Sequence, residues 1–154
     1  MQLGYRCHIY APEEESVAAE ASAAFTRADW HDDAAMAGFA EACDVITWEF
    51  ENVPVSALAD IPDGRLRPDP RALEVAQDRL VEKRFVEQHG GTPAPFAPVD
   101  SHADLEAAME RIGLPGILKT RREGYDGKGQ WRIAYPADAA ALDLDAGGFI
   151  YEGF

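Results

Sequence analysis

Short apolar runs alternate with polar, alanine-rich stretches in the first half of the chain, and this pattern predicts strands separated by helices. Strands are predicted over residues 6–10, 24–26 and 44–49, the last being the clearest. Helices are predicted over residues 13–24, 33–43 and 52–58. Strands that alternate with helices in this way favour a parallel α/β sheet.

The second half follows a different order, with two helices before the first strand. A proline-rich linker at 65–70 precedes helices at 71–77 and 78–88, and Pro70 suits the first turn of the earlier one. Strands are then predicted over residues 96–99, 115–119, 131–133 and 148–154, with helices over 105–112 and 137–144. The alternation of strands and helices therefore predicts an α/β fold with a parallel sheet.

Capping residues mark several of these helix boundaries. Asp32 is expected to cap the helix at 33–43, whose apolar face carries Met36, Phe39 and Ala40. Ser101 and Asp104 approximate a capping box for the helix at 105–112. Glycines at 90 and 91, followed by a proline at 93, end the helix at 78–88.

Composition and charge narrow the class of protein. The 154 residues suffice for one domain or a little more, and no apolar run approaches the roughly 20 residues of a membrane helix. Cys7 and Cys43 form no close pair and are interpreted as small buried residues of a cytoplasmic protein. Residues 1–63 hold 13 acidic and two basic side chains, against 15 and 12 in residues 64–154. This balance argues against nucleic acid as the main partner and places any anion site in the second part.

A basic, glycine-rich stretch interrupts this acidic chain. Five of its 14 Lys and Arg residues lie between Lys119 and Arg132, and glycines stand at 124, 127 and 129. Glycines let backbone N–H groups approach a ligand closely, so the stretch is predicted to be a strand–loop–strand hairpin over a phosphate group. Its spacing matches neither a P-loop, nor a dinucleotide fingerprint, nor a calcium loop. The alternative is an ordinary surface hairpin.

Three other places are candidates for binding. Lys119 ends an apolar strand, where it could contact phosphates or simply extend to solvent at a sheet edge. The segment 152–154 ends another apolar strand, where it could bind a purine edge or be an ordinary strand end. Glu49 and Glu51 follow the strand at 44–49, and at most one of them can face a given pocket. The four histidines share no metal-ligand spacing, and no serine-nucleophile elbow is present.

Several of these stretches resemble one known family. Residues 119–131 (KTRREGYDGKGQW), 47–54 (TWEFENVP) and 77–83 (QDRLVEK) resemble motifs of the N5-carboxyaminoimidazole ribonucleotide synthases, ATP-grasp enzymes of purine biosynthesis. Residues 5–10 resemble that family's second strand, and the matches keep the family's order to residue 154. The resemblance implies a parallel-sheet pre-ATP-grasp domain over 1–68, connecting helices over 69–82 and, over 83–154, the start of an ATP-grasp domain with its first α+β lobe.

The resemblance also implies a reaction and its residues. The family ligates bicarbonate to the amine of aminoimidazole ribonucleotide, using ATP and Mg²⁺. Lys119 and Lys128 would be the catalytic cations. Contacts to ATP would come from Arg79, Lys119, Gly124, Tyr125, Asp126, Gly127, Lys128, Gly129, Gln130, Glu152, Gly153 and Phe154. Contacts to the ribonucleotide would come from Tyr125, Asp126, Lys128 and Glu49.

The ends of the chain depart from the family pattern. The expected first strand and glycine turn, the metal-binding acids and the ribose-binding acid are absent, so the chain is interpreted as a fragment with no metal ligand of its own. We expect no synthase activity from the chain alone. Family members are commonly dimers, so the resemblance also implies a homodimer. A Lys119→Ala change is expected to weaken nucleotide binding and leave the fold intact. Two alternatives stay open: another ATP-grasp ligase, such as the formate-dependent relative, or a non-catalytic nucleotide-binding or interaction module.

Overall fold

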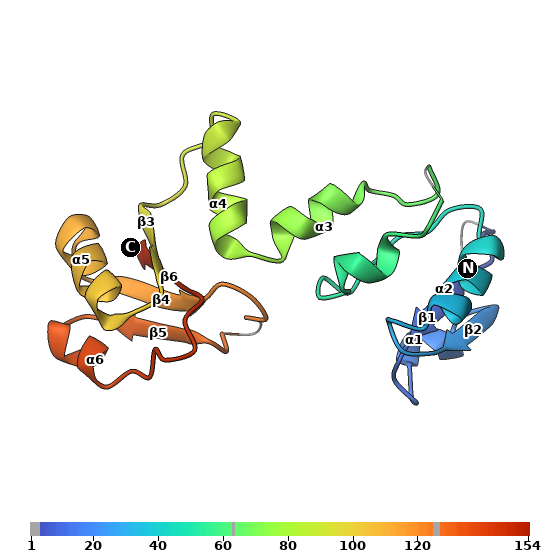
Figure 1. Ribbon diagram of the computed structural model, residues 1–154, viewed down its shortest axis with the longest axis horizontal. Coiled ribbons are helices and arrows are strands. Elements are labelled where there is room, and N and C mark those ends of the chain that lie inside the picture. Colours follow the sequence, from blue (N-terminus) through green and yellow to red (C-terminus); the bar gives the residue numbers. More distant parts are fainter. Residues whose placement is uncertain (1–3, 63, 125–126) are drawn as a thin grey trace. The chain divides into compact units, whose positions relative to one another are not determined.

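The chain divides into two units, residues 1–73 and 74–154, each with its own core. The computed structural model describes residues 4–62, 64–124 and 127–154. Within those limits, the first unit contains β1 (His8–Ala11), α1 (Val17–Glu20), β2 (Ala24–Arg27), α2 (Asp33–Glu41) and the 3₁₀ helix η1 (Val55–Leu58) (Figure 1).

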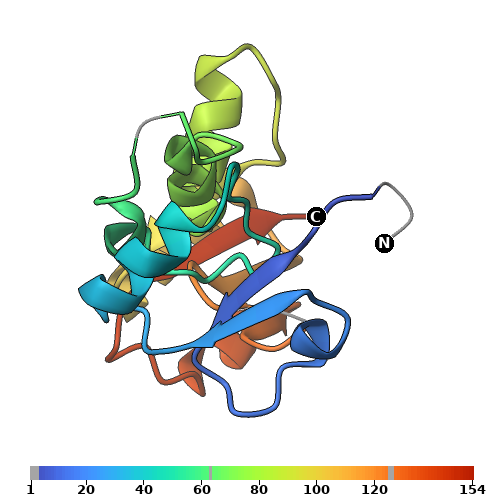
Figure 2. The same ribbon diagram turned by 90° about the vertical axis from the view of Figure 1, so that its right-hand side faces the viewer.

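A parallel strand pair and one helix organise the first unit. β1 and β2 lie side by side in parallel, with His8 opposite Ala24 and Ala11 opposite Arg27 (Figure 2). Asp32 caps α2 by accepting a hydrogen bond from the Ala35 N–H at 2.9 Å. The apolar face of α2 is buried with residues of β1, η1 and the following loop. The predicted parallel pairing and the predicted cap are therefore confirmed.

Two predictions in the first unit are wrong. Residues 44–49 form no strand; Ile46 makes a single parallel bridge to Leu66, with Ile46 N–H donating to Arg65 O and Arg67 N–H to Ile46 O. The helix predicted over 13–24 is reduced to Val17–Glu20, since the N–H groups of residues 23 and 24 donate to Cys7 O instead.

An antiparallel sheet organises the second unit. Helix α3 (Pro70–Ala76) spans the boundary between the units, and it is followed by α4 (Arg79–Gln88), β3 (Phe96–Val99), α5 (His102–Ile112), β4 (Gly116–Thr120), β5 (Gln130–Ile133), α6 (Pro136–Ala140) and β6 (Phe149–Gly153). The strand order is β3-β6-β4-β5, with every neighbouring pair antiparallel. The predicted hairpin on either side of the glycine-rich stretch is thus confirmed as β4 and β5.

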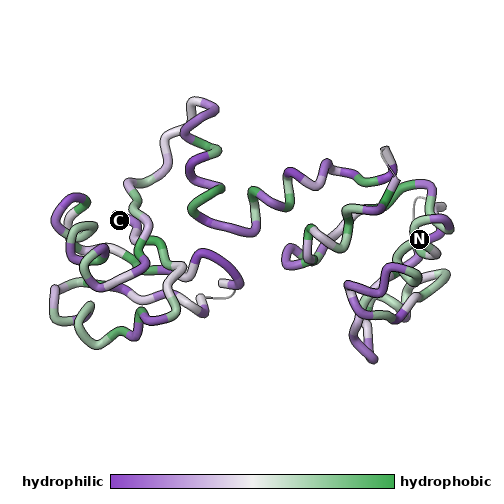
Figure 3. Tube along the Cα trace, in the orientation of Figure 1, coloured by the Kyte–Doolittle hydropathy of each residue, from purple (hydrophilic) through white to green (hydrophobic). Residues whose placement is uncertain are grey.

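The two faces of this sheet have different roles. Side chains alternate along each strand, so Leu118 and Tyr151 point to one face, where they pack with α5 and α6 and are fully buried. Lys119 and Glu152 point to the opposite face. Figure 3 shows hydrophobic residues within the strands of the sheet, whereas the described residues that enter the glycine-rich loop are hydrophilic. A charged site can therefore form on the face opposite α5 and α6.

Candidate functional site

Three charged side chains meet on that face of the sheet. Lys119 Nζ lies 2.8 Å from Glu152 Oε2, and Lys83 Nζ of α4 lies 3.4 Å from the same oxygen. Each lysine side chain is 16% exposed and the glutamate side chain 9%. Ile117 of β4 pairs with Glu152 of β6, which places Lys119 diagonally across from the carboxylate. The sheet register itself brings this cluster together.

Glu152 uses only one of its two carboxylate oxygens in these contacts. Oε2 contacts both lysines, whereas Oε1 is buried and accepts no hydrogen bond from any residue that the structure describes. A buried acceptor without a donor costs about 1–3 kcal/mol. Lys83 also lies 5.7 Å above the ring of Phe96, at the edge of the sheet. The cluster therefore offers two cations and one unused acceptor beside an aromatic ring.

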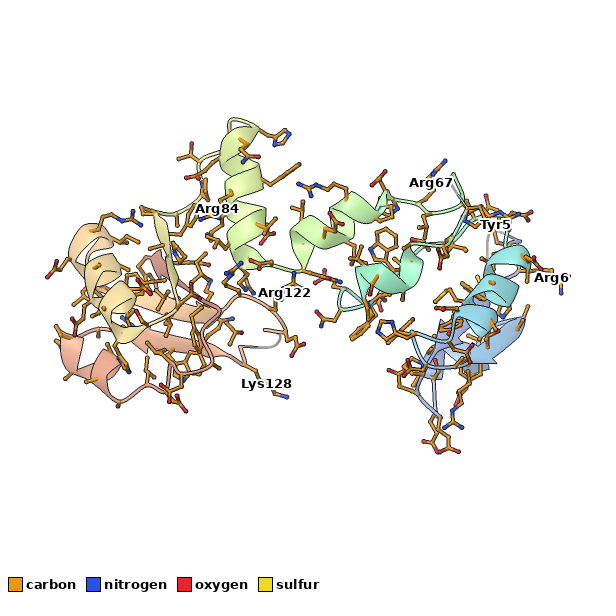
Figure 4. All side chains as sticks on the ribbon, in the orientation of Figure 1. Tyr5, Arg6, Arg67, Arg84, Arg122 and Lys128 are labelled. Carbon is orange, nitrogen blue, oxygen red and sulfur yellow. The ribbon has the colours of Figure 1, made fainter. Side chains whose placement is uncertain are left out.

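A second charged cluster lies at the start of α4. Asp78 caps the helix by accepting from the N–H groups of Leu80 (2.9 Å) and Val81 (3.3 Å). Its carboxylate also takes a bidentate pair from Arg121, with Nε–Oδ1 at 3.1 Å and Nη2–Oδ2 at 2.7 Å. Arg122 Nε lies 3.6 Å from Oδ2 but its side chain is 60% exposed, and Figure 4 shows it below the start of α4. Asp78 thus joins a helix terminus to the first residues after β4.

These contacts determine the protonation of Asp78. Burial, the largest single influence, raises its pKa, but the hydrogen bonds from Arg121, Val81 and Leu80 and the charge of Arg121 together leave the pKa below the ordinary 3.8. A carboxyl whose pKa is lowered by folding stabilises the folded state above its unfolded pKa and loses that contribution as the pH falls toward its folded pKa.

We therefore expect the second unit to lose stability on acidification from about pH 4 downward, near the unfolded pKa of aspartate. Asp78→Asn should flatten this part of the profile, because the amide does not titrate. The measurement is the urea midpoint of both proteins between pH 2.5 and 6. A profile of equal slope in the two proteins would show that other carboxyls dominate.

The described residues of the glycine-rich loop lie close to Thr120. Thr120 N–H donates to Gly129 O at 2.9 Å and closes the base of the loop. Gly129 has a φ of +67°, and a Cβ there would lie 2.5 Å from Thr120 Oγ1, so this position requires glycine. Lys128 is exposed on the loop between β4 and β5 (Figure 4). Tyr125 and Asp126 lie outside the described residues.

The structure places the remaining site predictions as follows. Arg79 is the first residue of α4, and Gln130 pairs with Lys119 at the start of β5. Gly153 N–H donates to Pro95 O, and Phe154 is 79% exposed with Arg132 Cζ 5.4 Å from its ring centre. Glu49 is exposed and belongs to the first unit. The structure therefore brings Lys119 together with Glu152, whereas Glu49 belongs to a separate unit.

Sequence reasoning assigned no role to three residues that build these clusters. Lys83 and Asp78 belong to the QDRLVEK stretch, of which only Arg79 was interpreted, and Arg121 was counted only as local positive charge. The signal for Asp78 was its position before α4, where aspartate is a favoured cap. Among the described residues, no three acidic, histidine or cysteine side chains are grouped to hold a metal ion. In the same part of the chain, no helix is long and apolar enough to cross a membrane.

Comparison with known proteins identifies a matching domain family for each of the two units. A family model of the ribonucleotide synthetase preATP-grasp domain matches residues 1–77, and one of the ATP-grasp domain matches residues 84–152. The two units are thus those of a preATP-grasp domain followed by part of an ATP-grasp domain. The chain belongs to the N5-carboxyaminoimidazole ribonucleotide synthase family of the ATP-grasp superfamily.

Individual relatives agree with that placement. The synthase of Brucella melitensis is 42% identical over 158 aligned positions, covering 99% of this chain and 44% of that protein. The crystal structure of the synthetase from Thermus thermophilus is 41% identical, with a TM-score of 0.86 over 99% of this chain and 41% of that one. The Staphylococcus aureus synthetase complexed with ADP is 31% identical, with a TM-score of 0.91 over 99% and 42%. The chain spans less than half the length of each of these relatives.

Proposed function

We propose that this chain is the nucleotide-binding first part of an ATP-dependent ligase that carboxylates 5-aminoimidazole ribonucleotide with bicarbonate. The observation that carries the proposal is the pairing of Lys119 and Lys83 with the buried Glu152, on the sheet face opposite α5 and α6. The solved relative from Staphylococcus aureus is a complex with ADP, which supports a nucleotide as a ligand of this family.

The residues suit the chemistry of such a ligase. ATP phosphorylates bicarbonate, and the ribonucleotide amine then attacks the resulting carboxyphosphate to form the carbamate and release phosphate. Lys119 and Lys128 supply positive charge beside the transferred group, while Arg79 and the amides of residues 124–130 contact the phosphates. Residues 152–154 would contact the adenine edge. Tyr125, Asp126, Lys128 and Glu49 would lie near the ribonucleotide.

Mg²⁺ is part of the proposal, with its ligands expected outside these 154 residues. The described residues hold no group of acids suited to a divalent cation, so no step is assigned to the metal. The proposal also includes a homodimer, from the family resemblance, and a cytoplasmic location, because Cys7 and Cys43 form no close pair in the sequence. The domain limits of 1–68, 69–82 and 83–154 are likewise proposed.

Calorimetric titration of the chain with ATP, ADP and GTP tests the nucleotide assignment. We expect weak, saturable binding of ATP and ADP, with no ATP turnover when aminoimidazole ribonucleotide and bicarbonate are added. Arg27→Gln is the control variant, and its ATP binding should equal that of the wild type. It removes a cation from the first unit, where Arg27 pairs with Glu14 at 3.4 Å. Binding that is absent in the wild type would contradict the nucleotide site. Turnover would contradict the view that further chain is required, and equally tight binding of GTP would favour a general nucleotide module.

A further inference from the structure

Arg121 is the most extensively fixed residue between β4 and the glycine-rich loop. Its guanidinium is paired with Asp78, its N–H donates to Gly148 O at 2.9 Å, and its carbonyl accepts from Arg79 N–H at 2.9 Å. The residue follows directly after β4 and stands three positions before Gly124. The first residue after the strand is therefore tied both to α4 and to the segment that enters β6.

Asp78 is the centre of this arrangement. It is 4% exposed, and its two oxygens serve both the α4 cap and the arginine pair. A cap needs only one neutral oxygen, and asparagine serves as well as aspartate at an N-cap. A bidentate carboxylate–guanidinium pair adds directional hydrogen bonds that a single cap bond lacks. The carboxylate therefore does more than begin the helix.

We propose that Asp78 is a positioning residue that fixes the root of the glycine-rich loop to the start of α4 through Arg121. The proposal rests on the proposed nucleotide function. It follows that Arg79 on α4 and Lys119 on β4 are held in fixed positions relative to each other. Asp78 would act on nucleotide binding through these residues without contacting the nucleotide.

Hydrogen exchange tests the anchor without any ligand. In the wild type, the amides of Arg79 and Arg121 should be protected, because they donate hydrogen bonds to Arg121 O and Gly148 O respectively. Asp78→Asn keeps the cap oxygen and removes the charge, and Arg121→Gln removes the pair from the other side. Each should speed exchange at these two amides roughly tenfold, the lower end of what the loss of a hydrogen bond to a charged group produces. Arg122→Gln is the matched control and should change exchange less than twofold, since its side chain is 60% exposed.

Nucleotide titration of the same variants tests the consequence. Asp78→Asn and Arg121→Gln should each weaken ATP binding roughly tenfold. The helical circular dichroism of the protein should persist in both variants. The double variant should bind no more weakly than either single one, because both changes remove the same interaction. Additive losses, or unchanged exchange in Asp78→Asn, would overturn the proposal. Wild-type chain that shows the protected amides but no ATP binding would contradict the proposed function and leave the anchor itself supported.

Discussion

Replacing Lys119 with methionine should remove nucleotide binding and also lower the free energy of unfolding of the second unit by about 3 kcal/mol. The second effect arises because Glu152 is 7% exposed and Lys119 is its nearer partner, at 2.8 Å. Without that lysine, the carboxylate's remaining cationic partner among the described residues is Lys83, at 3.4 Å. Urea unfolding and ATP titration of the same variant measure the two losses.

A second variant separates the two roles of the lysine. Lys119→Met/Glu152→Leu replaces the pair with apolar side chains and should recover most of the lost stability, because well-packed apolar substitutes for a buried ion pair are commonly neutral or better. Lys83 can then extend its ammonium group to solvent. ATP binding should stay absent, since the cation at position 119 is still missing. If the double variant binds ATP normally, Lys119 is a structural residue and the phosphate assignment is wrong.

The expected loss of stability on removing Lys119 differs from the sequence-based prediction that a Lys119 variant keeps its fold intact. A lysine at the end of an apolar strand suggests a side chain that can be removed without harm to the fold. The structure pairs it with a carboxylate 33 positions later in the chain, on a neighbouring strand. Loss of nucleotide binding in a single Lys119 variant would therefore not distinguish a missing phosphate contact from a disturbed strand.

Local patterns predicted the parts of the fold that local physics determines. Asp32 and Ser101 were recognisable as caps because a short polar side chain before a helix satisfies a free N–H. β4, β5 and β6 were recognisable as apolar runs interrupted by glycines. The strand predicted at 44–49 failed because its composition could not reveal that, among the described residues, its pairing would be reduced to one bridge between Ile46 and Leu66. Whether an apolar run becomes a strand depends on the neighbour that completes its hydrogen bonds.

The candidate site likewise contains residues that the sequence indicates and residues that only the fold brings together. Lys119 and the loop glycines were found because their residue types are unusual where they stand. Asp78 and Arg121 lie 43 positions apart, and no periodicity links them. Their pairing depends on how α4 approaches the end of β4, which is a property of the packed unit. The sequence therefore indicates the residues proposed to touch the nucleotide, whereas the contact between Asp78 and Arg121 emerges only in the folded unit.

Gly116→Ala should destabilise the second unit by about 3 kcal/mol, the upper part of the range for overpacking a core. A Cβ at this position would lie 2.2 Å from both Cζ and the hydroxyl oxygen of Tyr151. The ring cannot easily withdraw, because Tyr151 is fully buried and its hydroxyl donates to Gly113 O at 2.8 Å. Urea unfolding monitored by tyrosine and tryptophan fluorescence measures the loss.

Two companion variants make the cause of this loss testable. Gly38→Ala is the control, since a Cβ there meets no atom within 4 Å and an alanine inside α2 should stabilise the first unit by roughly 0.5–1 kcal/mol. Tyr151→Leu removes the outer ring atoms that the new Cβ would strike. Gly116→Ala should therefore cost far less in the Tyr151→Leu background than in the wild type, because the two positions share one contact. An equal cost in both backgrounds would show that the glycine is required by the backbone of β4.

Because the same strand ends near Lys119, a Gly116→Ala protein that still folds should also bind ATP less tightly, through displacement of β4.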